Sequence, residues 1–300
     1  TKVTYAKSLR EEYDSLRDGY LNRSREKNFL SIEKKKKNKF KIDWNTFEPI
    51  KPNFIGTKTI EVELSELVDF IDWTPFFQSW ELYGKFPAIL TDEIVGEQAS
   101  DLYKDAQKML SQIVSEKWFT AKGILGIFPA NTVNDDDIEV NLPTSSFQLL
   151  TLRQQSQKTV GAPNIALADF IAPKEIGKQD YIGCFCVTTG FGVDEKASEF
   201  EKQLDDYNSI LVKALGDRLA EAFAEYLHLK VRKEIWGYAS DEVLSNDELI
   251  KEQYKGIRPA PGYPACPDHL EKPTIWKLLN VEQEIGVKLT ESMAMWPAAS

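Results

Sequence analysis

The stretch of this sequence best suited to binding chemistry is an eleven-residue segment, Arg-Pro-Ala-Pro-Gly-Tyr-Pro-Ala-Cys-Pro-Asp, at positions 258–268. Each of its four prolines fixes φ near about −65° and removes a backbone donor, so the segment predicts a stiff, irregular loop. Arg258 offers a planar fork of donors suited to a carboxylate. Gly262 permits a left-handed turn or the close approach of a ligand, and Tyr263 adds a flat face and a hydroxyl. These features suit a small-molecule site, although a structural loop or a Pro-rich linker is the commoner role of such a composition.

Two carboxylates occur where they could complement a cation. Asp72 stands at the edge of residues 73–87, which are unusually rich in Trp, Phe and Tyr, and low polarity there would strengthen its attraction for a cation. A solvated turn or a helix cap explains Asp72 equally well. Glu221 belongs to a long helical pattern, and the pattern alone predicts that its polar face is solvated. The other members of that face are Asp217, Arg218, Glu225 and His228.

The familiar catalytic motifs are missing from the sequence. There is no glycine-rich strand-to-helix turn of the dinucleotide-binding or common methyltransferase type. The chain has two histidines and no evident Ser–His–Asp or Cys–His set. Its three cysteines, Cys184, Cys186 and Cys266, fit a reduced, cytoplasmic protein better than a disulfide framework, and their spacing does not fit zinc.

Composition narrows the possible partners. The net charge of −10 and the pI near 5.0 argue against a nucleic-acid-binding protein. No apolar run approaches the roughly 18–20 residues of a membrane span, and no signal peptide is visible. We therefore expect a cytoplasmic globular protein without a nucleic-acid or membrane partner. Because the chain starts with Thr rather than Met, we also expect an internal fragment of a longer protein.

The N-terminal part differs in character from the rest. Residues 1–33 predict a polar helix with a thin apolar stripe, and residues 44–53 predict an extended segment laid over the domain. The lysine run at 34–37 is typical of a solvated linker, and a docking patch for an acidic partner is the alternative. The stripe consists of Leu9, Tyr13, Leu16 and Tyr20.

Helical and strand patterns are mixed over the remainder of the chain. The connections between the predicted strands are short, which favours antiparallel pairing, and the fold class is α+β. No break is sharp enough to divide this part further. The predicted helices are 64–72, 92–115, 195–235, 245–254 and one capped by Asp268; the predicted strands are 123–128, 138–142, 147–152, 165–171 and 181–188.

The segment 258–268 resembles the S-adenosylmethionine-binding motif of the activation (reactivation) domain of cobalamin-dependent methionine synthase. Three further stretches resemble that family in the family's own order: Asp72–Phe77, Leu219–His228 and Leu289–Pro297. The resemblance runs from about residue 60 to the last residue. Together with the pattern of residues 1–53, which predicts an N-terminal helix and linker, it leads us to expect at 54–300 a domain with a bent, mainly antiparallel sheet surrounded by helices. The family domain continues beyond Trp296-Pro297 with Tyr-containing segments, so the resemblance also implies that its C-terminal part is absent here.

The resemblance implies a set of ligand contacts as well. Arg258 is expected to hold the methionine carboxylate, and Glu221 and Asp72 to face the cationic or the ribose side, although which does which is open. Ala260 and Tyr263 are expected to act largely through main-chain groups. The full implied set is Asp72, Glu221, Arg258, Ala260, Gly262 and Tyr263.

The activity implied by the resemblance is reductive remethylation of cobalamin. An electron from flavodoxin or a related reductase returns inactive cob(II)alamin to cob(I)alamin, which then takes the methyl group of S-adenosylmethionine. The sequence lacks an Asp-x-His-x-x-Gly motif, so the cobalamin is expected on another module of the full-length chain. This chain would then be a fragment of a methyltransferase rather than a complete enzyme. The alternatives are a module that senses S-adenosylmethionine or docks a partner without turnover, and a free-standing transferase.

Overall fold

The computed structural model describes residues 5, 7, 9, 10, 12–17 and 29–300. The described residues between 5 and 17 are helical, and Tyr13 and Leu16 of the predicted stripe are exposed there. Tyr20 lies outside the described residues. The prediction of a linker at the lysine run is wrong, because residues 34–37 belong to a short helix, α2 (Ile32–Lys37), in which Lys35 is buried.

Residues 38–53, here called the strap, run across the domain without a helix or strand. The Lys178 ammonium donates to the carbonyl oxygens of Trp44 (2.7 Å) and Phe47 (3.0 Å). The indole N–H of Trp236 donates to the carbonyl oxygen of Ile50 at 2.8 Å. The extended segment predicted at 44–53 therefore lies on the domain surface as expected.

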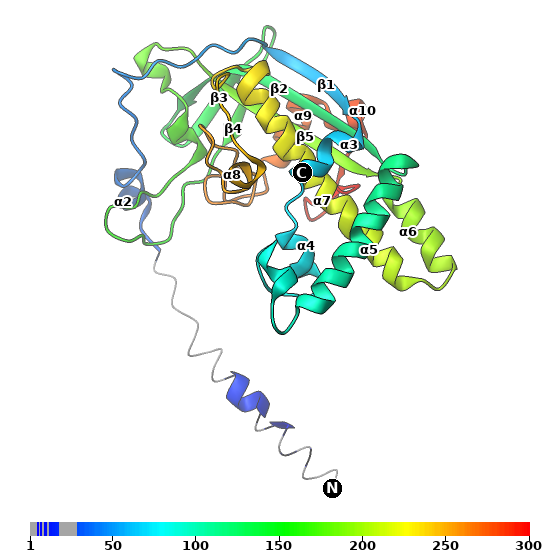
Figure 1. Ribbon diagram of the computed structural model, residues 1–300. Helices are drawn as coiled ribbons and strands as arrows, with labels where there is room; N and C mark the ends of the chain where they lie inside the picture. The colour runs from blue at the N-terminus through cyan, green and yellow to red at the C-terminus, as the bar shows by residue number, and fades with distance from the viewer. Residues whose placement is uncertain (1–4, 6, 8, 11, 18–28) are drawn as a thin grey trace.

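One antiparallel sheet forms the centre of the molecule (Figure 1). Its longest strand, β2, pairs with β5 along most of its length, with β1 along half of it and with β3 near its end, and β4 continues outward from β3. Every pair is antiparallel, which confirms the predicted fold class. The strands are β1 (Gly56–Val62), β2 (Thr120–Val133), β3 (Asp137–Asn141), β4 (Ser146–Leu150) and β5 (Asp180–Phe191).

The strands predicted from the sequence differ from the observed strands at two places. Strand β1 was not predicted, because Thr, Lys and Glu alternate through it and its side chains are largely exposed. The strand predicted at 165–171 is instead a 3₁₀ turn, η3 (Leu167–Phe170). Its Asp169 accepts a hydrogen bond from the Ala166 N–H and is paired with the buried Arg153, which holds the chain in a turn.

Helices cover both faces of the sheet (Figure 1). The single helix predicted at 195–235 is divided, because Leu204 adopts a positive φ of 60° and Asp205 caps a new helix through the Asn208 N–H. The helical elements on the first face are α3 (Leu64–Leu67), η1 (Val68–Phe70), α4 (Thr74–Ser79), η2 (Ala88–Thr91), α5 (Gly96–Ser115), α6 (Val193–Lys202) and α7 (Asp206–Lys230), which continues into a π-helical turn at Val231–Ile235. The remaining elements are η4 (Lys174–Ile176), α8 (Asn246–Ile250), α9 (Lys272–Leu279), α10 (Val281–Ile285), β6 (Lys288–Leu289) and β7 (Met295–Trp296).

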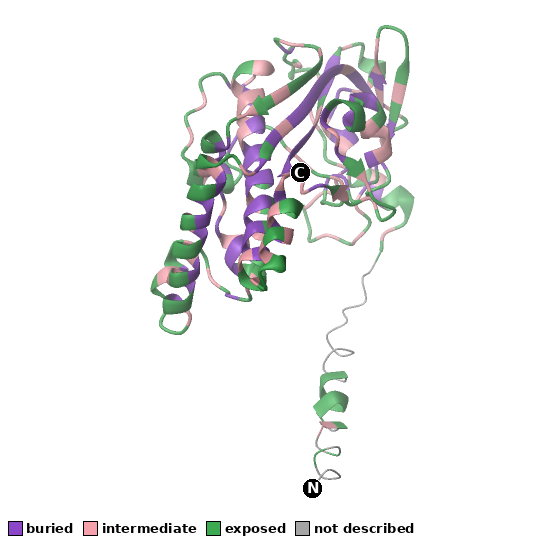
Figure 2. Cartoon of the chain, turned by 90° about the vertical axis from the view of Figure 1, so that its right-hand side faces the viewer, coloured by how far each residue is buried: buried purple, intermediate pink, exposed green. Residues whose placement is uncertain are grey.

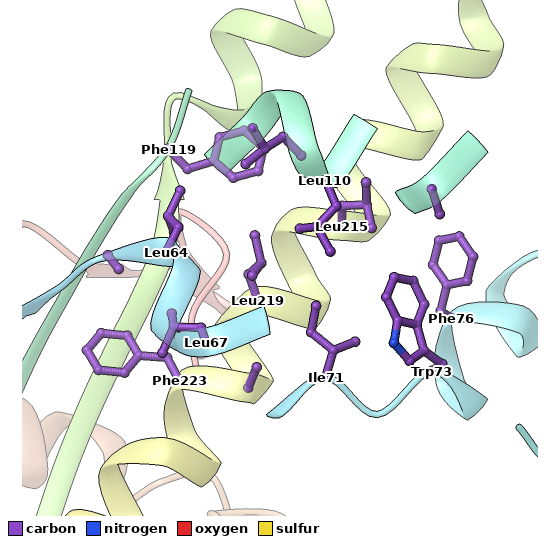
Figure 3. Packing of buried hydrophobic residues seen from close by; sticks show 14 of the residues in the cluster. Leu64, Leu67, Ile71, Trp73, Phe76, Leu110, Phe119, Leu215, Leu219 and Phe223 are labelled. Carbon is purple, nitrogen blue, oxygen red and sulfur yellow. The ribbon is translucent and has the colours of Figure 1, made fainter. Parts of the chain in front are cut away.

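Two apolar cores lie on opposite faces of the sheet. The larger one packs α7 between the sheet and helices α3 to α5, and Figure 3 shows Leu219 and Phe223 of α7 beside Leu67 of α3, and Leu215 of α7 beside Leu110 of α5. The smaller one lies under α9 and α10. Figure 2 shows buried residues through the sheet and along α7, with exposed residues on the outer helices. Helix α7 is thus the central positioning element of the fold.

No helix within the described part of the chain is both long and apolar enough to cross a membrane.

Candidate ligand site

The Pro-rich loop forms the irregular, stiff segment that its sequence predicts. The Gly262 N–H donates to the carbonyl oxygen of Cys266 at 2.7 Å, and the Tyr263 N–H donates to that of Ala260 at 3.1 Å. Gly262 has a φ of +101°, and a Cβ at this position would lie 2.4 Å from the ring of His269. Glycine is therefore required here both by the backbone conformation and by the neighbouring imidazole. Buried Ala265 and Cys266 anchor the loop, whereas the Tyr263 side chain is exposed.

Arg258, at the start of this loop, is paired with a carboxylate of α7. Its Nη2 lies 2.9 Å from Oε2 of Glu225, and the side chains are 23% and 10% exposed. Two atoms of this pair, Nη1 of Arg258 and Oε1 of Glu225, are buried without a hydrogen-bond partner among the described residues. Burial raises the pKa of the Glu225 carboxyl, and the positive charges of Arg258 and Arg232 offset part of that shift. This ion pair thus has one buried donor and one buried acceptor that could form hydrogen bonds with a ligand.

Glu221 lies one helical turn before Glu225 on α7, so both carboxylates project from neighbouring positions of one helix. Glu221 is exposed, and its Oε2 is 3.4 Å from the hydroxyl of Ser300. The chain reaches this point because Ser300 exchanges two backbone hydrogen bonds with Val187 of β5, each 2.9 Å long. Glu221 therefore faces solvent beside residues at 298–300.

Asp72 comes from another part of the chain, on a segment that packs against the same helix. It follows η1, whose Phe70 packs edge-on against Tyr226 of α7 at 5.5 Å between ring centroids. Figure 3 shows the segment of Ile71 and Trp73 running beside α7. One carboxylate oxygen of Asp72 accepts the Thr74 N–H at 2.9 Å, which forms a turn of the kind predicted as an alternative to ligand binding. Asp72 does not cap helix α4, whose N-cap residue is Trp73.

The predicted residues are therefore gathered around α7 to different degrees. Glu221 belongs to α7, and Arg258 is held against α7 by its ion pair with Glu225. Asp72 lies on a segment that packs against α7. Among the described residues, no hydrogen bond or ion pair joins the side chains of Asp72, Glu221 and Arg258 to one another.

A buried polar network lies behind the Arg258–Glu225 pair. Arg232, in the π-helical turn, is fully buried and donates to Glu242 through Nη2 at 2.8 Å. Its Nη1 lies 2.8 Å from Nδ1 of His228, and its guanidinium stacks 4.2 Å from the ring centroid of Tyr254. Tyr254 also packs edge-on against His228 at 4.7 Å. Because Tyr254 lies four residues before Arg258, this network fixes the chain that leads into the Pro-rich loop.

Sequence reasoning missed the roles of Glu225 and His228. Both were assigned to a solvated face of the helix, yet Glu225 is 8% and His228 is 5% exposed. The available signal was the recurrence of polar residues at 221, 225, 228 and 232, at helical spacing, inside an otherwise apolar stretch. A π-helical turn, such as the one that follows α7, is frequent at functional sites, but no sequence pattern predicts it.

The buried network predicts a loss of stability in mild acid. Burial, reinforced by the charges of Arg232 and Arg258, lowers the pKa of His228 from 6.5 to about 2. Below pH 6.5 the unfolded chain binds a proton at this histidine and the folded chain does not, so the free energy of unfolding falls as pH falls. The expected slope is roughly 1.4 kcal/mol per pH unit, or about 2 kcal/mol between pH 6.5 and 5.

Urea unfolding at a series of pH values measures this slope. His228→Asn keeps an acceptor near the position of Nδ1 and should flatten the profile between pH 5 and 6.5. His269→Asn, at the exposed histidine, is the matched control and should follow the parent protein. Parallel profiles for the parent and His228→Asn would contradict the assignment.

The site contains no evident metal centre or activated nucleophile. No group of three or more His, Cys, Asp or Glu side chains suited to a metal ion occurs among the described residues. Burial raises the pKa of the Cys184 and Cys186 thiols to about 12, so they are protonated at neutral pH. Two surface hollows occur elsewhere, one lined by Glu61 to Glu66 with Lys117, the other by Ile55, Phe128 and Leu142, and neither includes a predicted ligand residue.

Comparison with known proteins gives two findings. Residues 63–300 match the sequence model of the family described as the activation domain of vitamin B12 dependent methionine synthase. The fold is similar to a crystal structure of the MetH reactivation domain bound to AdoHcy, with a TM-score of 0.85 and 54% sequence identity. The similarity covers 90% of this chain and 84% of that one.

Proposed function

The chain belongs to the family of the activation domain of vitamin B12 dependent methionine synthase, and from that premise we propose that it binds S-adenosylmethionine for the reductive remethylation of cobalamin. The observation that carries the proposal is the Arg258–Glu225 ion pair at the start of the Pro-rich loop. It leaves one buried donor and one buried acceptor without a hydrogen-bond partner among the described residues. A similar structure holds AdoHcy, the demethylated form of the same metabolite. The domain is part of a methyltransferase and is proposed not to be a complete enzyme alone.

The donors and acceptors present suit the ligand. S-adenosylmethionine carries a carboxylate, an ammonium, a sulfonium and an adenosine. Arg258 would take the carboxylate through its open donor, since Arg–carboxylate hydrogen bonds are short and charge-assisted. Glu221 and Asp72 would face the sulfonium or the ribose. Main-chain groups of Ala260, Gly262 and Tyr263 would hold the adenosine along a loop that is already rigid.

The chain's contribution to the reaction is positioning. Cobalamin, held by another module of the full-length protein, supplies the nucleophile that accepts the methyl group. The sulfonium is a good leaving group, so no acid or base is needed from this domain. Holding the methyl group in line for attack replaces a bimolecular encounter by an oriented one. We further propose flavodoxin or a related reductase as the electron source, and a cytoplasmic location.

Mixing the chain with a separate cobalamin-binding module, a reductant and methyl-labelled S-adenosylmethionine tests the proposal. We expect label to appear on cobalt. Calorimetric binding without transfer would instead indicate a sensing or docking module. Transfer of label to a small acceptor in the absence of cobalamin would indicate a free-standing transferase.

A further inference from the structure

Glu225 is buried, whereas the predicted ligand residue on the same helix, Glu221, is not. It lies within α7, three residues before His228 and seven before Arg232, and its side chain is 10% exposed. Glu221, one turn earlier, is exposed. An isolated buried carboxylate is costly, so a carboxylate at this position needs a cation that stays beside it. Arg258 is the one residue of the described chain that forms an ion pair with it.

The geometry of the pair matters for the ligand. Arg–carboxylate pairs are often bidentate and then use two donors of the guanidinium. Here one bond, from Nη2 to Oε2 at 2.9 Å, holds the guanidinium, and Nη1 has no partner among the described residues. Glu225 thus fixes the direction of the guanidinium and leaves a second donor for an incoming carboxylate.

The backbone on both sides of the pair is constrained. Glu225 projects from the long buried helix α7, and His228 and Arg232 of the polar network follow it on this helix and its π-helical continuation. On the other side of Arg258 the next residue is Pro259, which stiffens the backbone. Without Glu225, the long Arg258 side chain would be free to sample other rotamers and would lose entropy when it bound a ligand.

We infer that Glu225 is a positioning residue of the ligand site, which acts through Arg258 on the amino-acid end of S-adenosylmethionine. The inference rests on the proposed function, and it goes beyond it by assigning a role to a residue outside the predicted contact set. Glu225 would not touch the sulfonium or the adenosine. Its removal should therefore matter for ligands with an α-carboxylate and not for ligands without one.

Three ligands separate this role from others. S-adenosylmethionine has both the amino-acid end and the sulfonium; S-adenosylhomocysteine keeps the amino-acid end and lacks the sulfonium charge. 5′-(Dimethylsulfonio)-5′-deoxyadenosine keeps the sulfonium and lacks the amino-acid end. Calorimetric titration of each, directly or in competition, with the parent protein and Glu225→Gln gives the pattern.

For Glu225→Gln we expect a loss of affinity of roughly 10- to 100-fold for the first two ligands, the range for a hydrogen bond between charged groups, and no change for the third. In an Arg258→Ala background the Glu225→Gln substitution should have no further effect, because the two residues act as one unit. Glu234→Gln, at an exposed glutamate in the turn after α7 that pairs with Lys230, is the matched control.

Other patterns overturn the inference. An equal loss on all three ligands would mean a general structural role, and a loss confined to S-adenosylmethionine would mean that Glu225 acts on the sulfonium charge. Unchanged binding of S-adenosylmethionine would show that Arg258 needs no help. Failure of the parent protein to bind S-adenosylmethionine would instead refute the proposed function, so the two results are distinguishable.

Discussion

Arg258→Ala is expected to weaken the binding of S-adenosylmethionine by roughly 2–5 kcal/mol, the range for removing one partner of a buried charge pair. This corresponds to a loss of affinity of about 30- to 5,000-fold. Two effects add in this substitution. The ligand carboxylate loses its cationic donor, and Glu225 is left buried without the ion that offsets its charge.

Calorimetric titration at constant salt measures the loss. Arg258→Lys separates charge from geometry, because lysine keeps the charge but cannot hold Glu225 and a ligand carboxylate with one planar group. We expect Arg258→Lys to recover only part of the affinity. Lys255→Ala, which removes an exposed cation three residues earlier, is the control for net charge. An Arg258→Ala protein that keeps its fold and the parent isotherm would rule out the assigned role.

Arg232→Ala is expected to lower the free energy of unfolding by roughly 3–5 kcal/mol. Arg232 is fully buried, and its partner Glu242 has a side chain that is 8% exposed. Removing the guanidinium leaves that carboxylate without its partner and also removes the donor that faces His228. A charge buried without compensation is far more costly than the pair itself.

Two variants make this prediction specific. Arg232→Met together with Glu242→Leu replaces the pair by apolar groups of similar size and should recover most of the lost stability. Lys230→Ala, which breaks an exposed pair with Glu234, should change the unfolding free energy by about 1 kcal/mol or less. Urea titrations of the three proteins provide the comparison, and an Arg232→Ala protein as stable as Lys230→Ala would refute the argument.

Local sequence signals predicted the fold class correctly. The two errors in the strand predictions have physical causes. Short runs rich in β-branched and aromatic residues, joined by short connections, predicted the antiparallel sheet, and Ser245 with Glu248 formed the predicted capping box. Strand β1 was missed because an exposed edge strand carries polar residues. The turn at 167–170 was taken for a strand because its cause is the long-range pair of Asp169 with Arg153, which no local pattern shows.

For the site, the sequence located the loop but not the residue that holds it. Four prolines and one glycine are enough to predict a stiff loop, since their constraints are covalent. The partnership of Arg258 with Glu225 joins positions 33 residues apart. It depends on which side of α7 the loop crosses, and that is decided by packing of the whole domain rather than by the helix pattern.

The strap at residues 38–53 constrains how the domain can meet another part of a larger protein. Its carbonyl groups are held by Lys178 and Trp236, and Trp236 follows the π-helical turn behind the ligand site. If this domain moved as a unit relative to another part of a larger protein, the strap would move with it, because these hydrogen bonds tie it to the domain. A hinge for such a movement would not lie within residues 44–53 unless those hydrogen bonds broke first.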